Sequence, residues 1–134
     1  MRKITLVDTH KLKHIEGFSK KRALWLEKKI VKEGLWTVPL KIESENFLVM
    51  DGQHRMEVAI SLGLQQVPCL LYTYDEVELW SLRDQYEVTP EIILERVLAE
   101  NILPYKTAKH AFPDSGDLKC SIKLQELIEN TVKI

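Results

Sequence analysis

The residues best suited to chemistry stand together in the segment Val49-Met50-Asp51-Gly52-Gln53-His54-Arg55. An apolar run from Phe47 to Met50 reaches a glycine there and continues in a helix-like pattern, which predicts a strand, a tight turn and a helix. The free N–H groups and positive dipole end of such a helix favour an anion. His54 and Arg55 would add to that attraction, and the Asp51 carboxylate would suit a metal ion or a hydroxyl donor. The segment therefore predicts phosphoryl chemistry.

The same turn has a purely structural interpretation. Asp51 would then cap the helix, Gly52 would make the turn tight, and His54 and Arg55 would be solvated first-turn residues. Residue spacing alone does not separate the two interpretations.

Two other segments carry residue types that active sites use. His14-Ile15-Glu16 follows the first predicted strand, where a single loop glutamate is by default solvated. Residues 104–113 lie between prolines, and extended backbone there would let several side chains point to one side. Taken alone, this second segment is an exposed basic loop. Its polar members are Lys106, Thr107, Lys109 and His110.

The turn segment and the His14-Ile15-Glu16 segment resemble motifs of the ParB/sulfiredoxin-like superfamily, and within it those of the free L-serine kinases. Asp51 to Arg55 resembles the superfamily signature D-G-x-H-R, whose turn holds nucleotide phosphates. The serine kinases have D-G-H-H-R there, so Gln53 replaces a histidine. His14-Ile15-Glu16 resembles their H-E pair with one residue inserted, and the resemblance implies that Glu16 is the general base.

The C-terminal segment resembles the P-K-T-T-R-H-x-L-P motif of the same kinases. Tyr105 is inserted after the proline, Ala108 replaces the second threonine and Lys109 replaces the arginine. Alanine removes a hydroxyl donor, and lysine gives a point charge where arginine gives a bidentate fork. These departures imply a weaker site or one tuned to a different hydroxyl substrate. Trp80 resembles an aromatic residue that helps those kinases hold the amino acid.

The order of the three motifs implies a small-molecule kinase. It would move a phosphoryl group from ATP or ADP to the hydroxyl of free L-serine or a close analogue, giving O-phospho-L-serine with Mg²⁺ as cofactor. The implied catalytic residues are Glu16, Asp51 and His54, with Asp51 also the Mg²⁺ ligand. The implied nucleotide-phosphate ligands are Gly52, Gln53, His54 and Arg55. The implied ligands of the substrate and the transferring phosphate are Trp80, Thr107, Lys109 and His110.

Two other functions of the superfamily are weaker alternatives. A ParB-like nucleotide-binding module that binds DNA or regulates would need a helix-turn-helix or a basic face after the signature, and the sequence shows neither there. A sulfiredoxin-like reductase would need a cysteine at position 53, and the side chain of Gln53 cannot act as a sulfur nucleophile.

Composition limits the class of protein. The chain has 134 residues, 45% hydrophobic and 29% charged, which predicts one compact domain over residues 1–134. A net charge of -1 gives no general attraction to nucleic acid. Cys69 and Cys120 lie in no CxxC motif, so two free thiols are expected. We also expect a soluble cytoplasmic protein, since no secretory leader and no membrane-spanning run are found.

Hydrophobic periodicity predicts the elements that must position these residues. Strands are expected at 4–7, 38–42, 47–50 and 67–72, the middle two as a hairpin with Pro39 at an edge or before a late start. Helices are expected from Ser19 to about Leu35, over 53–62, and from Thr89 to about Asn101. A right-handed crossover should return strand 67–72 beside the signature strand. The resulting class is α+β, a ParB/sulfiredoxin-like fold with a small mixed sheet packed with helices. Trp25 and Trp36 are expected in packing, and residues 120–129 as an extended piece and a final helical turn.

Overall fold

The computed structural model describes residues 2–114 and 118–133. Its main sheet has four strands in the order β1 (Thr5–Asp8), β5 (Gln66–Tyr72), β3 (Leu40–Glu43) and β4 (Val49–Asp51). The pairs β1–β5 and β3–β4 are antiparallel and β3–β5 is parallel, so the sheet is mixed. Two smaller sheets pair β2 (Leu35–Trp36) with β8 (Ile122–Lys123), and β6 (Glu78–Ser81) with β7 (Ala108–Ala111).

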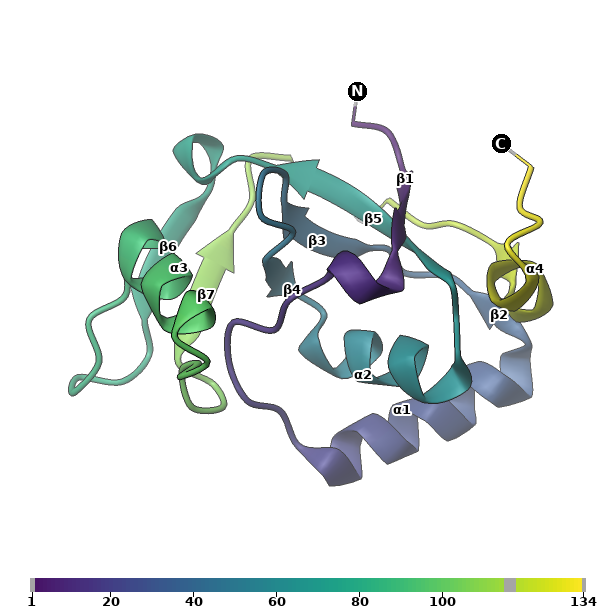
Figure 1. Cartoon of the computed structure of the whole chain (residues 1–134), viewed down its shortest axis with the longest axis horizontal. Coiled ribbons are helices and arrows are strands. Elements are labelled where there is room, and N and C mark those ends of the chain that lie inside the picture. Colours follow the sequence, from purple (N-terminus) through teal and green to yellow (C-terminus); the bar gives the residue numbers. More distant parts are fainter. Residues whose placement is uncertain (1, 115–117, 134) are drawn as a thin grey trace.

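Helices accompany all three sheets. The long helix α1 (Lys20–Glu33) packs against α2 (Gln53–Leu62), and Figure 1 shows α1 running beside α2. At one end of the molecule α3 (Pro90–Leu98) lies with β6 and β7, and at the other α4 (Leu124–Glu129) lies with β2. Short 3-10 helices η1 (Thr9–Lys11) and η2 (Tyr74–Glu76) follow β1 and β5. The predicted α+β class with a small mixed sheet is confirmed.

The helix boundaries follow the predicted capping signals. The Ser19 hydroxyl accepts a hydrogen bond from the N–H of Arg22 at 3.2 Å, and the Thr89 hydroxyl accepts one from Ile92 at 3.1 Å. Gly34 ends α1 in the left-handed conformation, with φ of 71°. Because that conformation turns the chain away from the helix axis, Leu35 belongs to β2, and its predicted place in the helix is wrong.

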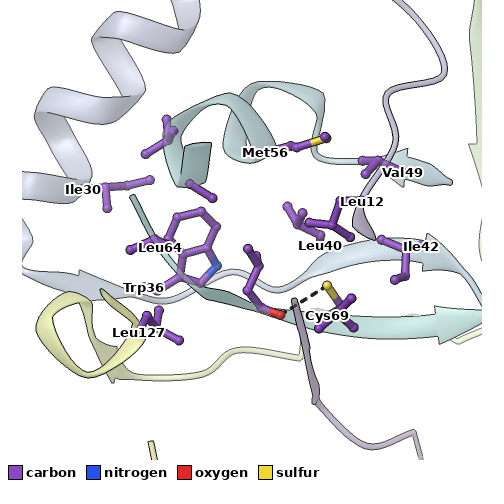
Figure 2. Close-up of a cluster of buried hydrophobic side chains, with 14 of the residues drawn as sticks. Leu12, Ile30, Trp36, Leu40, Ile42, Val49, Met56, Leu64, Cys69 and Leu127 are labelled. Atoms are coloured by element: carbon purple, nitrogen blue, oxygen red, sulfur yellow. Dashed lines mark hydrogen bonds between the residues drawn. The ribbon is translucent and has the colours of Figure 1, made fainter. Parts of the chain in front are cut away.

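The main core lies between the sheet, α1, α2 and α4. Figure 2 shows Trp36 within it, among Ile30, Leu64 and Leu127. Trp36 is 1% exposed, as its predicted packing role requires. Trp25 is 64% exposed, so its predicted packing role is wrong. The reason is that α1 lies outside α2 and buries only a narrow stripe, Leu26 and Ile30.

The return of the chain after α2 differs from the prediction. Strand β5 pairs with β3, which separates it from β4, and β4 runs antiparallel to β5. The signature strand and β5 are therefore not joined by a parallel crossover. In the tight β3–β4 hairpin, β4 pairs with one side of β3 and forms the edge of the sheet. The other side of β3 is free to pair with β5. Pro39 precedes β3, so its missing N–H does not interrupt the ladder, and the predicted late start of that strand is confirmed.

Both cysteines are free thiols, as predicted. Cys69 is buried in the main core and Cys120 is half-buried. Burial raises the pKa of each thiol, which keeps it protonated and unreactive. Among the described residues, none of the helices combines the length and the apolar character needed to cross a bilayer.

Candidate active site

The turn after β4 is built around Gly52. Its φ is 121°, and a Cβ at this position would lie 2.5 Å from the buried Leu40 side chain. Gly52 is also the N-cap of α2, and within the described chain no side chain caps that helix start. The structural alternative in which Asp51 caps the helix is therefore wrong. The first N–H groups of α2 are left without a side-chain acceptor, which is the arrangement that binds anions.

The C-terminal segment faces this turn across a cleft of about 530 Å³. It is not an exposed loop, because residues 108–111 form β7 against β6, and Thr107 and His110 are buried. The turn residues Asp51 to Arg55, Glu16, Lys109 and His110 all line the cleft. Three segments that are distant in the sequence are thus brought together at one cleft.

The cleft concentrates positive charge in a protein whose net charge is -1. Two carboxylates, Glu16 and Asp51, line it beside five cations. The cations are Arg22, Lys29, Arg55, Lys106 and Lys109. Walls of low dielectric focus the field of such a cluster. A polyanion such as a nucleotide phosphate chain is the ligand that this charge pattern suits.

Glu16 joins two walls of the cleft. One carboxylate oxygen accepts a hydrogen bond from the N–H of Ala108 at 2.8 Å, and the other from the N–H of Lys106 at 3.2 Å. The side chain is buried, and burial raises the pKa of Glu16 although these N–H groups and Arg83 oppose the shift. Each oxygen keeps acceptor capacity beyond its one backbone partner. A carboxylate with a raised pKa on a cleft wall can act as a proton acceptor.

His54 connects the starts of α1 and α2. Its Nε2 accepts a hydrogen bond from the N–H of Ser19 at 3.0 Å, so that bond assigns the proton to Nδ1. Burial lowers the pKa of His54, and the nearby charges of Arg22 and Arg55 contribute to the same direction. His54 is therefore a neutral N–H donor at pH 7.

The Gln53 side chain positions other residues. Its amide N–H donates to the carbonyl of Val49 at 2.6 Å, and its amide oxygen lies 2.6 Å from Nδ1 of His14. The other His14 nitrogen lies 2.8 Å from a carboxylate oxygen of Glu57. This chain of contacts fixes the His14 to Glu16 segment against α2. The backbone N–H of Gln53, in the first turn of α2, is the group of this residue that remains for the predicted phosphate contact.

Arg55 lies half-buried between the cleft and a neighbouring recess of about 210 Å³. Burial lowers the pKa of its guanidinium, and the charge of Asp51 opposes that shift. Asp51 itself is exposed at the end of β4. The guanidinium is thus partly removed from water and remains charged, a state in which a phosphate contact is strong.

The residues predicted to hold the substrate divide into two groups. Lys109 and His110 line the cleft, whereas Thr107 and Trp80 do not. The Thr107 hydroxyl is fully buried and donates to the carbonyl of Pro104 at 2.6 Å, which stabilises the bend of the chain. Trp80 is 42% exposed and stands opposite Lys109 in the β6–β7 ladder. It therefore lies beside the cleft and outside its lining.

His110 is a neutral group at pH 7. Burial, with a smaller contribution from the charge of Lys109, lowers its pKa to about 4. Its Nε2 lies 3.1 Å from the hydroxyl of Tyr74. His110 can therefore contribute a hydrogen bond in the cleft, while the positive charge of this wall comes from the lysines.

Sequence reasoning missed the contribution of α1 and of Tyr105. Arg22, Trp25, Leu26 and Lys29 line the cleft at helical spacing. Tyr105, the inserted residue, lines it as well, with its ring 5.6 Å from that of His54. The sequence signal available for α1 was a tryptophan within a lysine-rich helix, and its exposure became known only from the structure. The structure, which places this face on the same cleft as the turn, is needed to show the contribution of α1.

The comparisons with known proteins show a shared fold. Neither a family model nor a curated protein sequence matches the chain. A free serine kinase solved with AMP superposes with a TM-score of 0.82 at 14% identity, covering 92% of this chain and 93% of that one. A free serine kinase in which one glutamate is replaced by alanine, solved with ADP, gives a TM-score of 0.80 at 14% identity and the same coverages.

Two further solved structures are similar. C-terminally truncated SbnI from Staphylococcus aureus gives a TM-score of 0.79 at 12% identity, covering 92% of this chain and 88% of that one. A conserved hypothetical protein from Pyrococcus furiosus gives 0.69 at 13%, covering 92% and 97%. The chain therefore has the fold of a solved free serine kinase, a member of the group that its motifs resemble.

Proposed function

We propose that this protein is a kinase that moves a phosphoryl group from ATP or ADP to the hydroxyl of free L-serine or a close analogue. The observation that carries the proposal is the cleft in which the uncapped start of α2 faces Glu16 and Lys109. The solved kinase with the same fold is described with AMP and with ADP, which supports a nucleotide as the donor. Its acceptor, serine, supports a small hydroxy amino acid here.

The nucleotide phosphates would bind at the start of α2. The free N–H groups of its first turn, the Nδ1–H of His54 and the Arg55 guanidinium are the donors available there. Lys109 approaches from the opposite wall and would compensate the charge of the transferring group. Donors fixed before the reaction cost no reorganisation when charge develops, so they stabilise the transition state.

Glu16 would be the general base. The acceptor hydroxyl oxygen attacks the terminal phosphorus, the bond from that phosphorus to the bridging oxygen breaks, and Glu16 takes the hydroxyl proton. The products are O-phospho-L-serine and a nucleotide shortened by one phosphate. A base of this kind contributes a factor of about 10² to 10⁴. Positioning by the two walls and charge compensation would supply most of the remaining acceleration.

Magnesium would enter with the nucleotide. The described residues contain no group of three or more histidine, cysteine, aspartate or glutamate side chains able to hold a metal alone. Mg²⁺ in kinases is usually held by one or two carboxylates together with substrate phosphates. The exposed carboxylate of Asp51 beside the anion site fits that pattern. The ion would neutralise charge on the phosphates, and Asp51 would be its protein ligand.

Mass spectrometry of an amino-acid panel, incubated with Mg²⁺ and either ATP or ADP, tests the function. A gain of one phosphate on serine or one close analogue is the expected result, and the panel identifies the acceptor. Nucleotide binding without phosphorylation of any panel member would contradict the proposal that the protein is a kinase. A gel shift with duplex DNA, run with and without nucleotide, would then test the ParB-like alternative.

A further inference from the structure

Trp25 is an exposed tryptophan that lines the cleft. It is 64% exposed, although tryptophan is usually among the more buried residues of a protein. The Lys29 ammonium nitrogen lies 5.7 Å from the centre of its ring, a cation–π distance. The core does not require this side chain, because α1 is anchored by Leu26 and Ile30.

The cleft-lining residues of α1 form one face of that helix. Arg22, Trp25, Leu26 and Lys29 recur at intervals of three and four residues, so they lie along one side. That side lines the cleft together with the start of α2. The cleft therefore contains an indole surface, with a cation on each side of it along the helix, as well as the uncapped start of α2. This combination suits a ligand that is anionic at one end and aromatic at the other.

We propose that Trp25 is the stacking platform for the base of the bound nucleotide. The inference deepens the proposed function and rests on it. Phosphates held at the start of α2 would leave the base to lie along α1, where the indole offers a flat apolar surface. The other cleft-lining residues of α1 are two cations and a leucine, which offer no hydrogen-bond acceptor for a base edge. Recognition is therefore by stacking, and adenine and guanine nucleotides should both be accepted.

Titration calorimetry with three probes tests this inference. ADP and GDP carry phosphates and a base, whereas inorganic pyrophosphate carries phosphates alone. Trp25→Ala should weaken ADP and GDP binding about 5- to 150-fold and leave pyrophosphate binding within about twofold of the parent. Trp25→Phe should keep most of the affinity, because phenylalanine also stacks. Leu24→Ala is the matched control, since Leu24 is the exposed neighbour of Trp25 and does not line the cleft.

The outcomes separate this inference from the proposed function. If the parent binds ADP and Trp25→Ala binds it equally well, the platform is wrong and the kinase proposal stands. If Trp25→Ala weakened the binding of ADP and of pyrophosphate equally, the stacking proposal would also be overturned, because the substitution would then act on the phosphate site. A more than tenfold preference of the parent for ADP over GDP would overturn recognition by stacking. If the parent binds none of the probes, the proposed function itself fails.

Discussion

One carboxylate oxygen of Glu16 lies 2.8 Å from the backbone nitrogen of Ala108. The two residues belong to segments far apart in the sequence, and this contact joins the two segments beside the cleft. Glu16 thus has a structural role that can be measured apart from its proposed role as a base. The same carboxylate orders the wall that carries Lys109.

Glu16→Gln should lower turnover by about two orders of magnitude or more, because an amide cannot accept the hydroxyl proton. Glutamine can still accept one backbone hydrogen bond, so nucleotide affinity should change little. Steady-state kinetics and calorimetry on the same preparation check both statements. Glu16→Ala, which removes the clamp as well, should in addition lower the melting temperature. Unchanged turnover in Glu16→Gln would show that another group is the base.

Gly52→Ala should destabilise the protein by about 2 kcal/mol, because alanine is strained at φ of 121° and its Cβ would collide with Leu40. Gly63→Ala is the matched control, since Gly63 also has a positive φ but nothing lies within 4 Å of the added Cβ. That control should cost only about 1 kcal/mol. Urea unfolding of both variants gives the comparison. Equal costs would mean that the turn has room for a side chain.

Arg55→Ala should weaken ADP binding by about 1.5–3 kcal/mol, the range expected for a charge-assisted hydrogen bond. Calorimetry measures the loss, and circular dichroism should show an unchanged fold. Lys28→Ala on the outer side of α1 is the control for loss of one positive charge, because Lys28 does not line the cleft. Equal ADP affinity in Arg55→Ala and the parent would show that this turn is not the phosphate site.

His110 should make the protein sensitive to acid. Its folded pKa of about 4 lies below the ordinary 6.5, so between these values the unfolded chain binds more protons than the folded one. Its contribution to stability is therefore complete above pH 6.5 and is lost as pH falls toward 4, by about 3 kcal/mol in all. His110→Gln should remove this part of the pH dependence. Urea unfolding of the variant and the parent at several pH values measures the difference.

The local elements could be predicted from the sequence because their signals are local. Ser19 and Thr89 capped helices where expected, and Gly52 formed the turn. The pairing of β5 could not be predicted, since both edges of the hairpin were available to a returning strand. Trp25 was misassigned for a related reason. A tryptophan on a helix packs or stays exposed according to what lies beside it, and that depends on the tertiary arrangement.

The position of the C-terminal segment also depends on the tertiary arrangement and could not be predicted from local sequence. Its residue types indicated either a basic loop or a phosphate site. Burial of Thr107, and of His110 within the ladder with β6, decided between an exposed loop and an ordered wall. Residues 104–113 carry no local signal for the segments that they contact, because those segments lie far away in the chain. The resemblance to the serine kinases supplied that long-range information.

Phosphorus NMR of the complete reaction tests the central claim most directly. With ATP or ADP, Mg²⁺ and L-serine, the terminal phosphate signal of the nucleotide should decline as a phosphate monoester signal grows in equal amount. Lys109→Ala should slow this exchange at least tenfold with little change in melting temperature, because Lys109 is exposed and its charge faces the cleft. A parent protein that releases only inorganic phosphate, or leaves the nucleotide intact with every hydroxy amino acid, would contradict the account.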